Sequence, residues 1–460
     1  MPRLALSMIV RDAAADLERC LASVRPVADE IVIADTGSRD NTIAVARAHG
    51  ARVISIAWSN DFAAARNAAL EPVTADWVLS LDADERLDPE ARQELPRLFA
   101  NRKIAAYQVN IRNYFRDARI HMYDQLARAN DGRLAEARDC AAFVVHQNLR
   151  LFRRQSWIRF EGRVHENVSR SVLAHGGAIG PPSLLIHHLG LADPEAMRRK
   201  AQAYRELGKQ KVREMPNDAQ AHLELGAEEL EHFGEPAVAL ALFERACLLA
   251  PGMALAWYYL GLARIRVHQL PAAVEALTAA ERLGISGPLL YDARGDARYD
   301  LGEFSAAARD YRRALKLVGE SALIESKLGL AEIRAGELDA GFARMKRAVR
   351  REPDNATVRD RMIAAAAAVH RLALAAEAAE DYLRVIPHPS ERAFLRAATL
   401  RAQLRQWTQA EAVLRDGLSR WPASPALCEA LREVETGAAA PMPENKNPSL
   451  PPVPNFPPLA

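Results

Sequence analysis

The stretch Trp77-Val-Leu-Ser-Leu-Asp-Ala-Asp-Glu85 decides the fold of the N-terminal part of the chain. Its first five residues predict a buried strand, and three carboxylates follow within four positions. Carboxylates so close together repel one another, and a hard divalent ion held by one or two of them offsets that repulsion. Asp-x-Asp alone also occurs in solvated turns. Its position directly after a predicted strand favours the metal site.

Three further apolar runs lie upstream, at residues 4–10, 31–34 and 53–56, and each predicts a strand. Between them, helical spacing covers 16–24, 42–49 and 62–70, with Asn60 or Asp61 as the cap of the last helix. Asp88 followed by Pro89 predicts the cap and first position of a helix that runs toward Phe99. Such alternation predicts a mostly parallel, Rossmann-like α/β sheet with helices on both faces. Ligands bind such sheets beyond the carboxyl ends of the strands, where Asp35 and the segment 82–85 fall.

From about residue 217 the sequence becomes alanine-rich and repeats itself every 34 or 35 residues. The repeat is marked by Leu225-Gly226, Leu260-Gly261, Gly295 and Leu328-Gly329, with small and bulky residues at fixed offsets behind each. This pattern resembles the tetratricopeptide repeat, in which stacked helix pairs bury one continuous core. It predicts an all-α solenoid of about six units, the last two (356–389 and 391–422) degenerate.

The sequence therefore divides into four parts. Residues 1–192 form the α/β domain, 193–216 a linker helix, 217–436 the helical repeats, and 437–460 a proline-rich tail that we expect to be disordered or polyproline-like. The linker helix is rich in lysine and arginine. A basic docking surface would explain this composition, but a solvated connecting helix explains it more simply.

Composition excludes several classes of protein. A chain of 460 residues with 49% apolar and 26% charged residues is that of a globular protein with two or three domains. A net charge of +2 argues against nucleic-acid binding through a broad basic field. No run approaches the roughly 18 apolar residues of a membrane helix, and residues 4–10 are too short and too interrupted for a secretory signal. Cysteines occur only at Cys20, Cys140, Cys247 and Cys428, without paired spacing, which excludes a disulfide scaffold and a cysteine-rich zinc site and favours the cytoplasm.

Four motifs occur in a fixed order: LSMIVR (6–11), DEIVIADTGSRDNT (29–42), WSNDFAAARN (58–67) and WVLSLDADE (77–85). In this order they resemble a family 2 glycosyltransferase of the GT-A fold, in the branch that carries tetratricopeptide repeats. The segments RLFR (150–153), FEGRVHE (160–166) and IHHLG (186–190) fit the same family. One departure is that the first strand of this branch usually runs into Asn-Glu, whereas Arg11-Asp12 stands here. Either an acid is kept one place along or its contact is lost.

The resemblance implies roles for five residues. Asp35 would accept a hydrogen bond from the base of a nucleotide-diphosphate sugar, although it could equally cap the turn at Gly37 and Ser38. Asp82 and Asp84 would form the motif for Mn²⁺ or Mg²⁺, with Asp84 as the direct ligand. Arg66 would neutralise the donor diphosphate, unless it is an ordinary surface arginine. His188 would be a further ligand of the metal or the diphosphate; because His187 and His188 point to opposite sides of a strand, only one would face the site.

Transfer of a sugar with inversion also requires a general base that faces the anomeric carbon. Glu166, in Val-His-Glu, is the candidate, with Glu161 and Glu85 as the next choices. The competing interpretation is that Glu166 pairs with Arg163 or Arg159 and is structural.

The leading hypothesis is an inverting, metal-assisted glycosyltransferase that uses a nucleotide-diphosphate sugar and an unknown acceptor. A protein or peptide acceptor, or a partner, could bind the groove of the repeats. The alternative is a protein-binding scaffold whose N-terminal domain binds a nucleotide sugar without catalysis. A nucleotidyltransferase would require a glycine-rich loop after the first strand, and residues 11–15 contain no glycine. A glycosidase would leave the metal and nucleotide motifs without a use.

Overall fold

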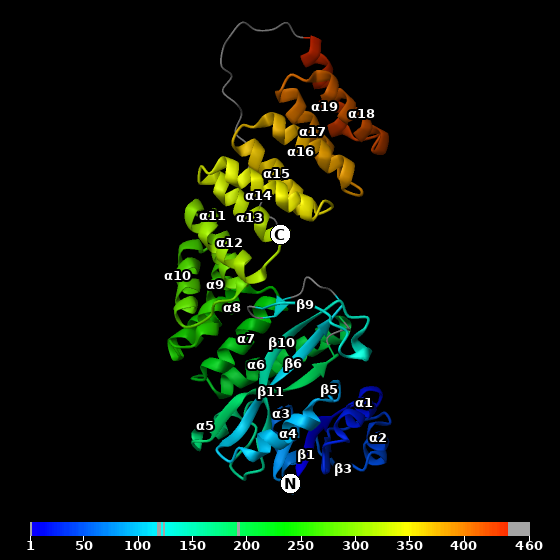
Figure 1. Ribbon diagram of the computed structural model, residues 1–460, viewed down its shortest axis with the longest axis vertical. Coiled ribbons are helices and arrows are strands. Elements are labelled where there is room, and N and C mark those ends of the chain that lie inside the picture. The colour runs from blue at the N-terminus through cyan, green and yellow to red at the C-terminus, as the bar shows by residue number, and fades with distance from the viewer. Residues whose placement is uncertain (1, 117–120, 123–124, 191–193, 440–460) are drawn as a thin grey trace. The chain divides into compact units, whose positions relative to one another are not determined.

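The computed structural model describes residues 2–116, 121–122, 125–190 and 194–439 (Figure 1). The chain divides into two compact units, Met1–Ile285 and Ser286–Ala460. Most of the proline-rich tail, from residue 440 onward, lies outside the described residues, as does part of the loop region 110–145. Within the described parts, every helix is too short or too polar to cross a lipid bilayer.

The predicted α/β sheet is confirmed. Its strands follow the order β3-β2-β1-β4-β10-β6-β11-β5, with β9 paired to β10. The first four are parallel, whereas β10 and β5 run antiparallel to their neighbours. The strands are β1 (Leu4–Val10), β2 (Glu30–Asp35), β3 (Arg52–Ser55), β4 (Trp77–Ser80), β5 (Glu85–Leu87), β6 (Ile104–Phe115), β9 (Arg128–Ala129), β10 (Ala142–Arg153) and β11 (Ala178–His188); β7 (His121–Met122) and β8 (Gln125–Leu126) pair separately.

Helices cover both faces of this sheet, because alternate residues of each strand point to opposite sides. Leu4, Leu6 and Met8 of β1 pack in one core with α1 (Ala14–Val24), α2 (Thr42–Ala48) and α4 (Ala91–Ala100). Ala5 points to the other core, with α3 (Phe62–Leu70) and α5 (Ser169–Ala174). The short helix η1 (Ala135–Ala137) lies in the loop before β10. The two cores hold the carboxyl ends of β1, β2 and β4 at one edge.

The predicted start of a helix at Asp88 is wrong. Residues Glu85–Leu87 form the edge strand β5, and α4 begins at Ala91. The carboxylate of Asp88 is buried and accepts hydrogen bonds from Nε2 of His187 at 2.9 Å and from Nε of Arg133 at 2.7 Å. Asp88 also accepts from the backbone N–H of Glu90 at 3.0 Å, but its other contacts are long-range and the helix starts beyond Glu90.

The first unit continues into helices α6 (Pro194–Glu214), α7 (Ala219–Glu231), α8 (Pro236–Leu249), α9 (Ala254–Arg266) and α10 (Leu270–Arg282). The prediction that the linker helix α6 is solvated is wrong for Lys211, which is only 4% exposed. Its ammonium group donates to the carbonyl of Val164 at 2.9 Å and to Glu224 at 2.6 Å. The lysine is buried because it joins the α/β domain to the first repeat.

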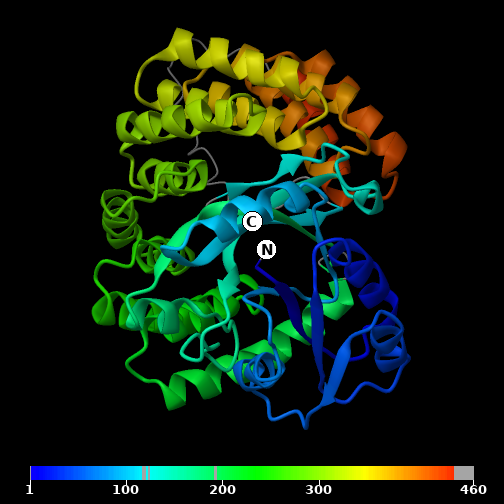
Figure 2. The same cartoon turned by 60° about the horizontal axis from the view of Figure 1, so that its bottom comes forward.

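The second unit contains helices α11 (Pro288–Asp300), α12 (Phe304–Val318), α13 (Ala322–Arg334), α14 (Leu338–Arg351), α15 (Ala356–Ala368), α16 (Leu372–Val385), α17 (Glu391–Gln403), α18 (Trp407–Arg420) and α19 (Pro425–Ala439). They stack as successive antiparallel pairs, coloured yellow-green to orange in Figure 2. The glycines of the repeat lie where paired helices touch. A Cβ atom at Gly295 would lie 2.6 Å from Tyr311, and one at Gly329 would lie 2.8 Å from Met345. This contact explains the spacing of small and bulky residues in the sequence.

Candidate active site

A cavity of about 900 Å³ opens at the carboxyl edge of the parallel strands and lies wholly within the first unit. Arg11 and Thr36, which follow β1 and β2, line it together with Asp82 and Asp84, which follow β4. Arg66 and Glu166 line it as well. Four of the predicted site residues therefore face one space, as expected for an α/β sheet that binds a ligand beyond its strand ends.

Arg66 is buried at the floor of this cavity, which contradicts its interpretation as a surface arginine; it is 5% exposed. Helix α3 positions it, and Asp61 caps that helix by accepting from the backbone N–H of Ala64 at 2.9 Å. The guanidinium donates to Glu166 at 2.5 Å, to Asp82 at 2.6 Å and to Ser80 at 3.1 Å. Burial alone would lower the pKa of Arg66, but the two carboxylates raise it, so the group stays cationic.

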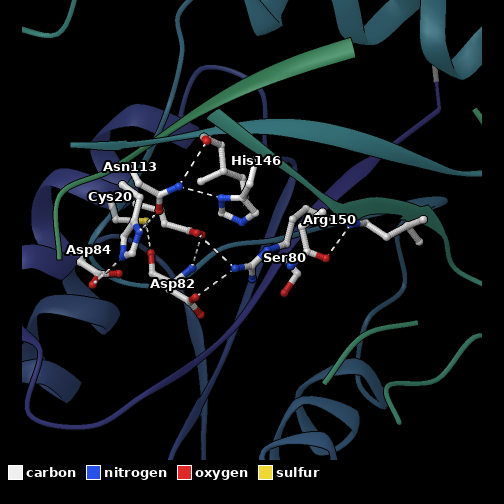
Figure 3. A network of polar contacts seen from close by, with 12 residues as sticks. Cys20, Ser80, Asp82, Asp84, Asn113, His146 and Arg150 are labelled. Carbon is white, nitrogen blue, oxygen red and sulfur yellow. Dashed lines mark hydrogen bonds and ion pairs between the residues drawn. The ribbon is translucent and has the colours of Figure 1, made fainter. Parts of the chain in front are cut away.

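Arg150, on β10, is the second cation of the site. Its Nη2 lies 3.1 Å from Asp82 and 3.1 Å from Glu85. Glu85 is buried and also accepts from the backbone N–H of Asp82 at 2.8 Å. Burial raises the pKa of Glu85, against the opposing effect of Arg150. Asp82 thus forms ion pairs with both Arg66 and Arg150; Figure 3 labels Asp82, Arg150 and Ser80 of this network.

Of the three glutamates considered as the base, Glu166 alone lines the cavity. Glu85 is enclosed beneath it, and Glu161 is exposed and pairs through its backbone with Asn167. The predicted structural partners of Glu166, Arg163 and Arg159, are replaced by Arg66. Its role as base stays a prediction, because a carboxylate in an ion pair must take up a proton beside a cation.

Asp84 and His188 come together from positions 104 residues apart, with Oδ2 of Asp84 lying 3.3 Å from Nε2 of His188. The other ring nitrogen of His188 lies 2.8 Å from the side-chain oxygen of Asn113, whose amide lies 2.7 Å from His146 (Figure 3). This outer contact fixes the orientation of the His188 ring. A Cβ atom at Gly190 would lie 1.9 Å from Oδ2 of Asp84, so the glycine leaves room for that carboxylate.

These residues fit a divalent cation that takes its remaining ligands from a substrate diphosphate and water. Asp84 would supply an oxygen and His188 a nitrogen, and Gly190 packs closely against both. Asp82 fits less well as a ligand, since both of its oxygens are bound to arginines. Among the described residues, no group of three or more His, Cys, Asp and Glu side chains is arranged to hold a metal without a substrate.

His187 points away from the cavity, as expected for the neighbour of His188 on a strand. It is 1% exposed and lies 2.9 Å from the hydroxyl of Tyr114 and 2.9 Å from Asp88. Burial lowers the pKa of His187, although Asp88 opposes this effect. It is a packed residue with satisfied polar atoms.

Asp35 is buried at the end of β2, and its carboxylate accepts from the backbone N–H groups of Gly37 and Ser38, each at 3.1 Å. The turn-capping interpretation is therefore confirmed. Thr36, the next residue, lines the cavity, whereas Asp35 does not. Contact between Asp35 and a nucleotide base stays a prediction.

The departure at Arg11-Asp12 is resolved in part. Arg11 lines the cavity, while the carboxylate of Asp12 accepts from the backbone N–H of Arg39 at 2.6 Å. The acid kept one place along thus holds the loop after β2, and it does not face the cavity. Asp12 adopts a left-handed backbone with φ of 47° to make this contact.

Sequence reasoning assigned no role to several residues of the site. Arg150 belongs to the family segment 150–153 but has no assigned role there, and Asn113, near the end of β6, belongs to none of the motifs. The cavity also extends to the helices that follow the α/β domain, with Tyr204 of α6, Glu228 and His232 at the end of α7, and Tyr259 of α9. No sequence pattern places these beside Glu166, because the approach depends on how α6 and α7 pack on the α/β domain.

Comparison with known proteins agrees with this geometry. Residues 7–159 match the family model "Glycosyl transferase family 2". The chain is 38% identical over 174 residues to a TPR repeat-containing protein of Synechococcus elongatus, covering 38% of this chain and 37% of that protein. It is 32% identical over 114 residues to an uncharacterized glycosyltransferase of Rickettsia felis, covering 24% and 40%. The matches thus span well under half the length of these relatives.

The helices resemble the crystal structure of a tetratricopeptide repeat protein from Parabacteroides merdae, with a TM-score of 0.40 and 12% identity over 52% of this chain and 94% of that one. That likeness is too distant to bear on function. The repeat assignment rests instead on the helix pairs and on the glycine contacts between them. The chain therefore joins a family 2 glycosyltransferase domain at its N-terminal side to helical repeats of the tetratricopeptide kind.

Proposed function

We propose that the protein moves a sugar from a nucleotide-diphosphate sugar to an acceptor, with inversion and with the help of a divalent cation. The observation that carries the proposal is the convergence of Asp82, Asp84, Glu166 and Arg66 on one cavity at the carboxyl ends of parallel strands. A domain without catalytic activity would not require a cluster of carboxylates paired with arginines at this position.

The acceptor atom attacks the anomeric carbon while the bond from that carbon to the diphosphate breaks on the opposite face. Glu166 takes the proton of the acceptor, and Arg66 holds Glu166 in position for this transfer. Asp84 and His188 would hold Mn²⁺ or Mg²⁺, and the chemistry that such an ion supplies is the stabilisation of negative charge on the departing diphosphate. Asp35 would contact the base of the nucleotide.

The experiment is calorimetric titration of the purified protein with a panel of nucleotide sugars, with and without Mn²⁺. The test variant is Asp82→Ala/Asp84→Ala. The matched control is Asp131→Asn, since Asp131 also pairs with an arginine but does not line the cavity. We expect metal-dependent binding of one donor that is lost in the double variant and kept in the control.

The second candidate is a scaffold that binds a protein partner through its repeats and has no catalytic role. The helix pairs of the repeats favour it, because such arrays present extended binding surfaces. Absence of donor binding by folded protein across the whole panel would favour this candidate. We further propose a cytoplasmic location, which suits the four free cysteines.

A further inference from the structure

The candidate catalytic residues share their cavity with the first helical repeat. Besides Asp84 and Glu166, its lining includes Tyr204 of α6, Glu228 of α7 and Tyr259 of α9. These helices belong to the same compact unit as the α/β domain. One side of the cavity is thus formed by the α/β domain, which would hold the donor. Another side is formed by helices to which the proposed sugar transfer assigns no role.

The helices are held firmly against the domain by contacts to the segment that carries Glu166. Arg163 makes two hydrogen bonds to Glu214 of α6, at 2.9 and 3.0 Å. Lys211 donates to the carbonyl of Val164, and Arg170 pairs with Asp218. Because several of these contacts lie next to Glu166 in the chain, the position of the helices is fixed relative to the candidate base.

Glu228 is the most informative side chain of the helical wall. It is 16% exposed, and among the described residues no donor reaches its buried Oε2 within hydrogen-bond distance. The nearest histidine nitrogens are those of His165 at 3.9 Å and His232 at 4.0 Å, both too distant for a hydrogen bond. Burial raises the pKa of Glu228, against the opposing effect of the two histidines. Oε2 itself is enclosed, but the side chain lines the cavity, so a ligand that donates to this carboxylate from the cavity side offsets part of the cost of its burial.

The other acids of the wall already have partners. Glu224 pairs with Lys211 at 2.6 Å, and Glu231 accepts from the hydroxyl of Tyr259 at 2.6 Å. Lys211 offsets the charge of Glu224, and the hydroxyl of Tyr259 donates to Glu231, so Glu228 is the acid of the wall without a hydrogen-bond donor among the described residues. The wall therefore offers an acceptor to a ligand that carries hydroxyl groups.

Aromatic rings border the same space. Trp58 and Phe62 meet edge to face with centroids 4.8 Å apart, and Tyr204 continues the row 5.7 Å from Phe62. All three line the cavity. Rings with a polar tip and an apolar body suit a ligand that has both hydroxyl groups and an apolar face.

We propose that the linker helix α6 and the first helical repeat together form the acceptor subsite, and that the group it binds is a neutral sugar residue, with hydroxyls donating to Glu228 and the ring packed against Tyr204. The assignment rests on the proposed function, because it names the acceptor of the same reaction. It makes Glu228 and Tyr204 specificity-determining residues.

The test measures binding of methyl glycosides of glucose, galactose, mannose and N-acetylglucosamine by saturation-transfer NMR, which needs no turnover. Short peptides that contain Ser, Thr, Cys and Lys form a second arm. Wild type is compared with Glu228→Gln, Tyr204→Leu and the control Glu235→Gln, which removes an exposed carboxylate outside the cavity. Calorimetric titration with nucleotide sugars runs in parallel on all four proteins, and their melting temperatures establish that each is folded.

We expect one glycoside to bind wild type and the control alike, about tenfold more weakly to Glu228→Gln and Tyr204→Leu, with donor affinity unchanged in all four. Glycoside binding that the two variants do not alter overturns the assignment of the subsite. Donor binding without glycoside binding, or peptide binding in its place, overturns the acceptor class and leaves the proposed function intact. Glycoside binding that depends on Glu228 in a protein that binds no donor refutes the proposed function alone and keeps the sugar site.

Discussion

Gly190→Ala tests the proposed cation site through a side chain that is not itself a ligand. The new methyl group would lie 1.9 Å from Oδ2 of Asp84 and 3.0 Å from Nε2 of His188. Ordinary contact between such atoms begins at about 3.4 Å, so the carboxylate must retreat by about 1.5 Å. The backbone at Gly190 is not left-handed, and alanine adopts it without strain. The change therefore acts on Asp84 and not on the fold.

Displacing a ligand or its support typically lowers metal affinity by about 10- to 100-fold, and we expect a loss of this size for Mn²⁺. Electron paramagnetic resonance of free Mn²⁺ measures it, in the presence of a nucleoside diphosphate that completes the ion's ligands. Gly252→Ala is the matched control, because a Cβ atom there meets nothing within 4 Å. An unchanged Mn²⁺ affinity in folded Gly190→Ala would refute the assignment of the ion to Asp84 and His188.

Three further predictions concern stability. Arg66→Met removes the cation that Asp82 and Glu166 share. Because Asp82 is partly exposed, we expect the free energy of unfolding in urea to fall by about 3 kcal/mol, the low end of the usual range. A decrease below about 1 kcal/mol would contradict this expectation. A Cβ atom at Gly261 would lie 2.5 Å from Leu277, so Gly261→Val should cost about 1–3 kcal/mol and lower the melting temperature, and unchanged melting would show that the helices can move apart. Burial alone would raise the pKa of Asp88, but hydrogen bonds from an arginine, a backbone N–H and a histidine hold it below the ordinary 3.8. Ionised Asp88 therefore stabilises the fold above about pH 4, and this stabilisation is lost as the pH falls through the folded-state pKa. In acid-unfolding measurements, the stability of Asp88→Asn should fall less steeply with decreasing pH than that of wild type.

The sequence predicted those parts of the fold that depend on local pattern. The predicted strand 77–81 is found as β4, which ends one residue earlier at Ser80, and α3 begins at Phe62 because Asp61 caps it. The glycines of the repeat coincide with the contacts between paired helices, because only a residue without a side chain allows the bulky partner to come so close. The meeting of Asp84 with His188 followed from the order of motifs and not from local chemistry, since 104 residues separate the two.

What the sequence missed depends on contacts between distant segments. The competing interpretation of Glu166 paired it with Arg163 or Arg159, but Arg163 donates to Glu214 of α6, and Arg66 pairs with Glu166 from 100 residues away. Asp88 has the right neighbours for a helix cap, yet its long-range hydrogen bonds to buried partners take precedence. Lys211 lies in a helix whose lysine- and arginine-rich composition is typical of a solvated helix. It is nevertheless buried, because the first repeat packs against the α/β domain.

The charge balance of the cavity indicates different roles for the two arginines and for the proposed divalent cation. Arg66 and Arg150 together hold Asp82, Glu85 and Glu166, so three carboxylates face two guanidinium groups. A donor diphosphate would add negative charge to a site whose arginines are already paired, and it would have to displace a carboxylate to reach them. Asp84 lies 3.3 Å from His188, and the proposed ion would bind the diphosphate on that side. The arginines thus hold the carboxylates, whereas the proposed cation would neutralise the donor, and we therefore expect loss of Arg66 to affect folding and loss of Asp84 to affect binding.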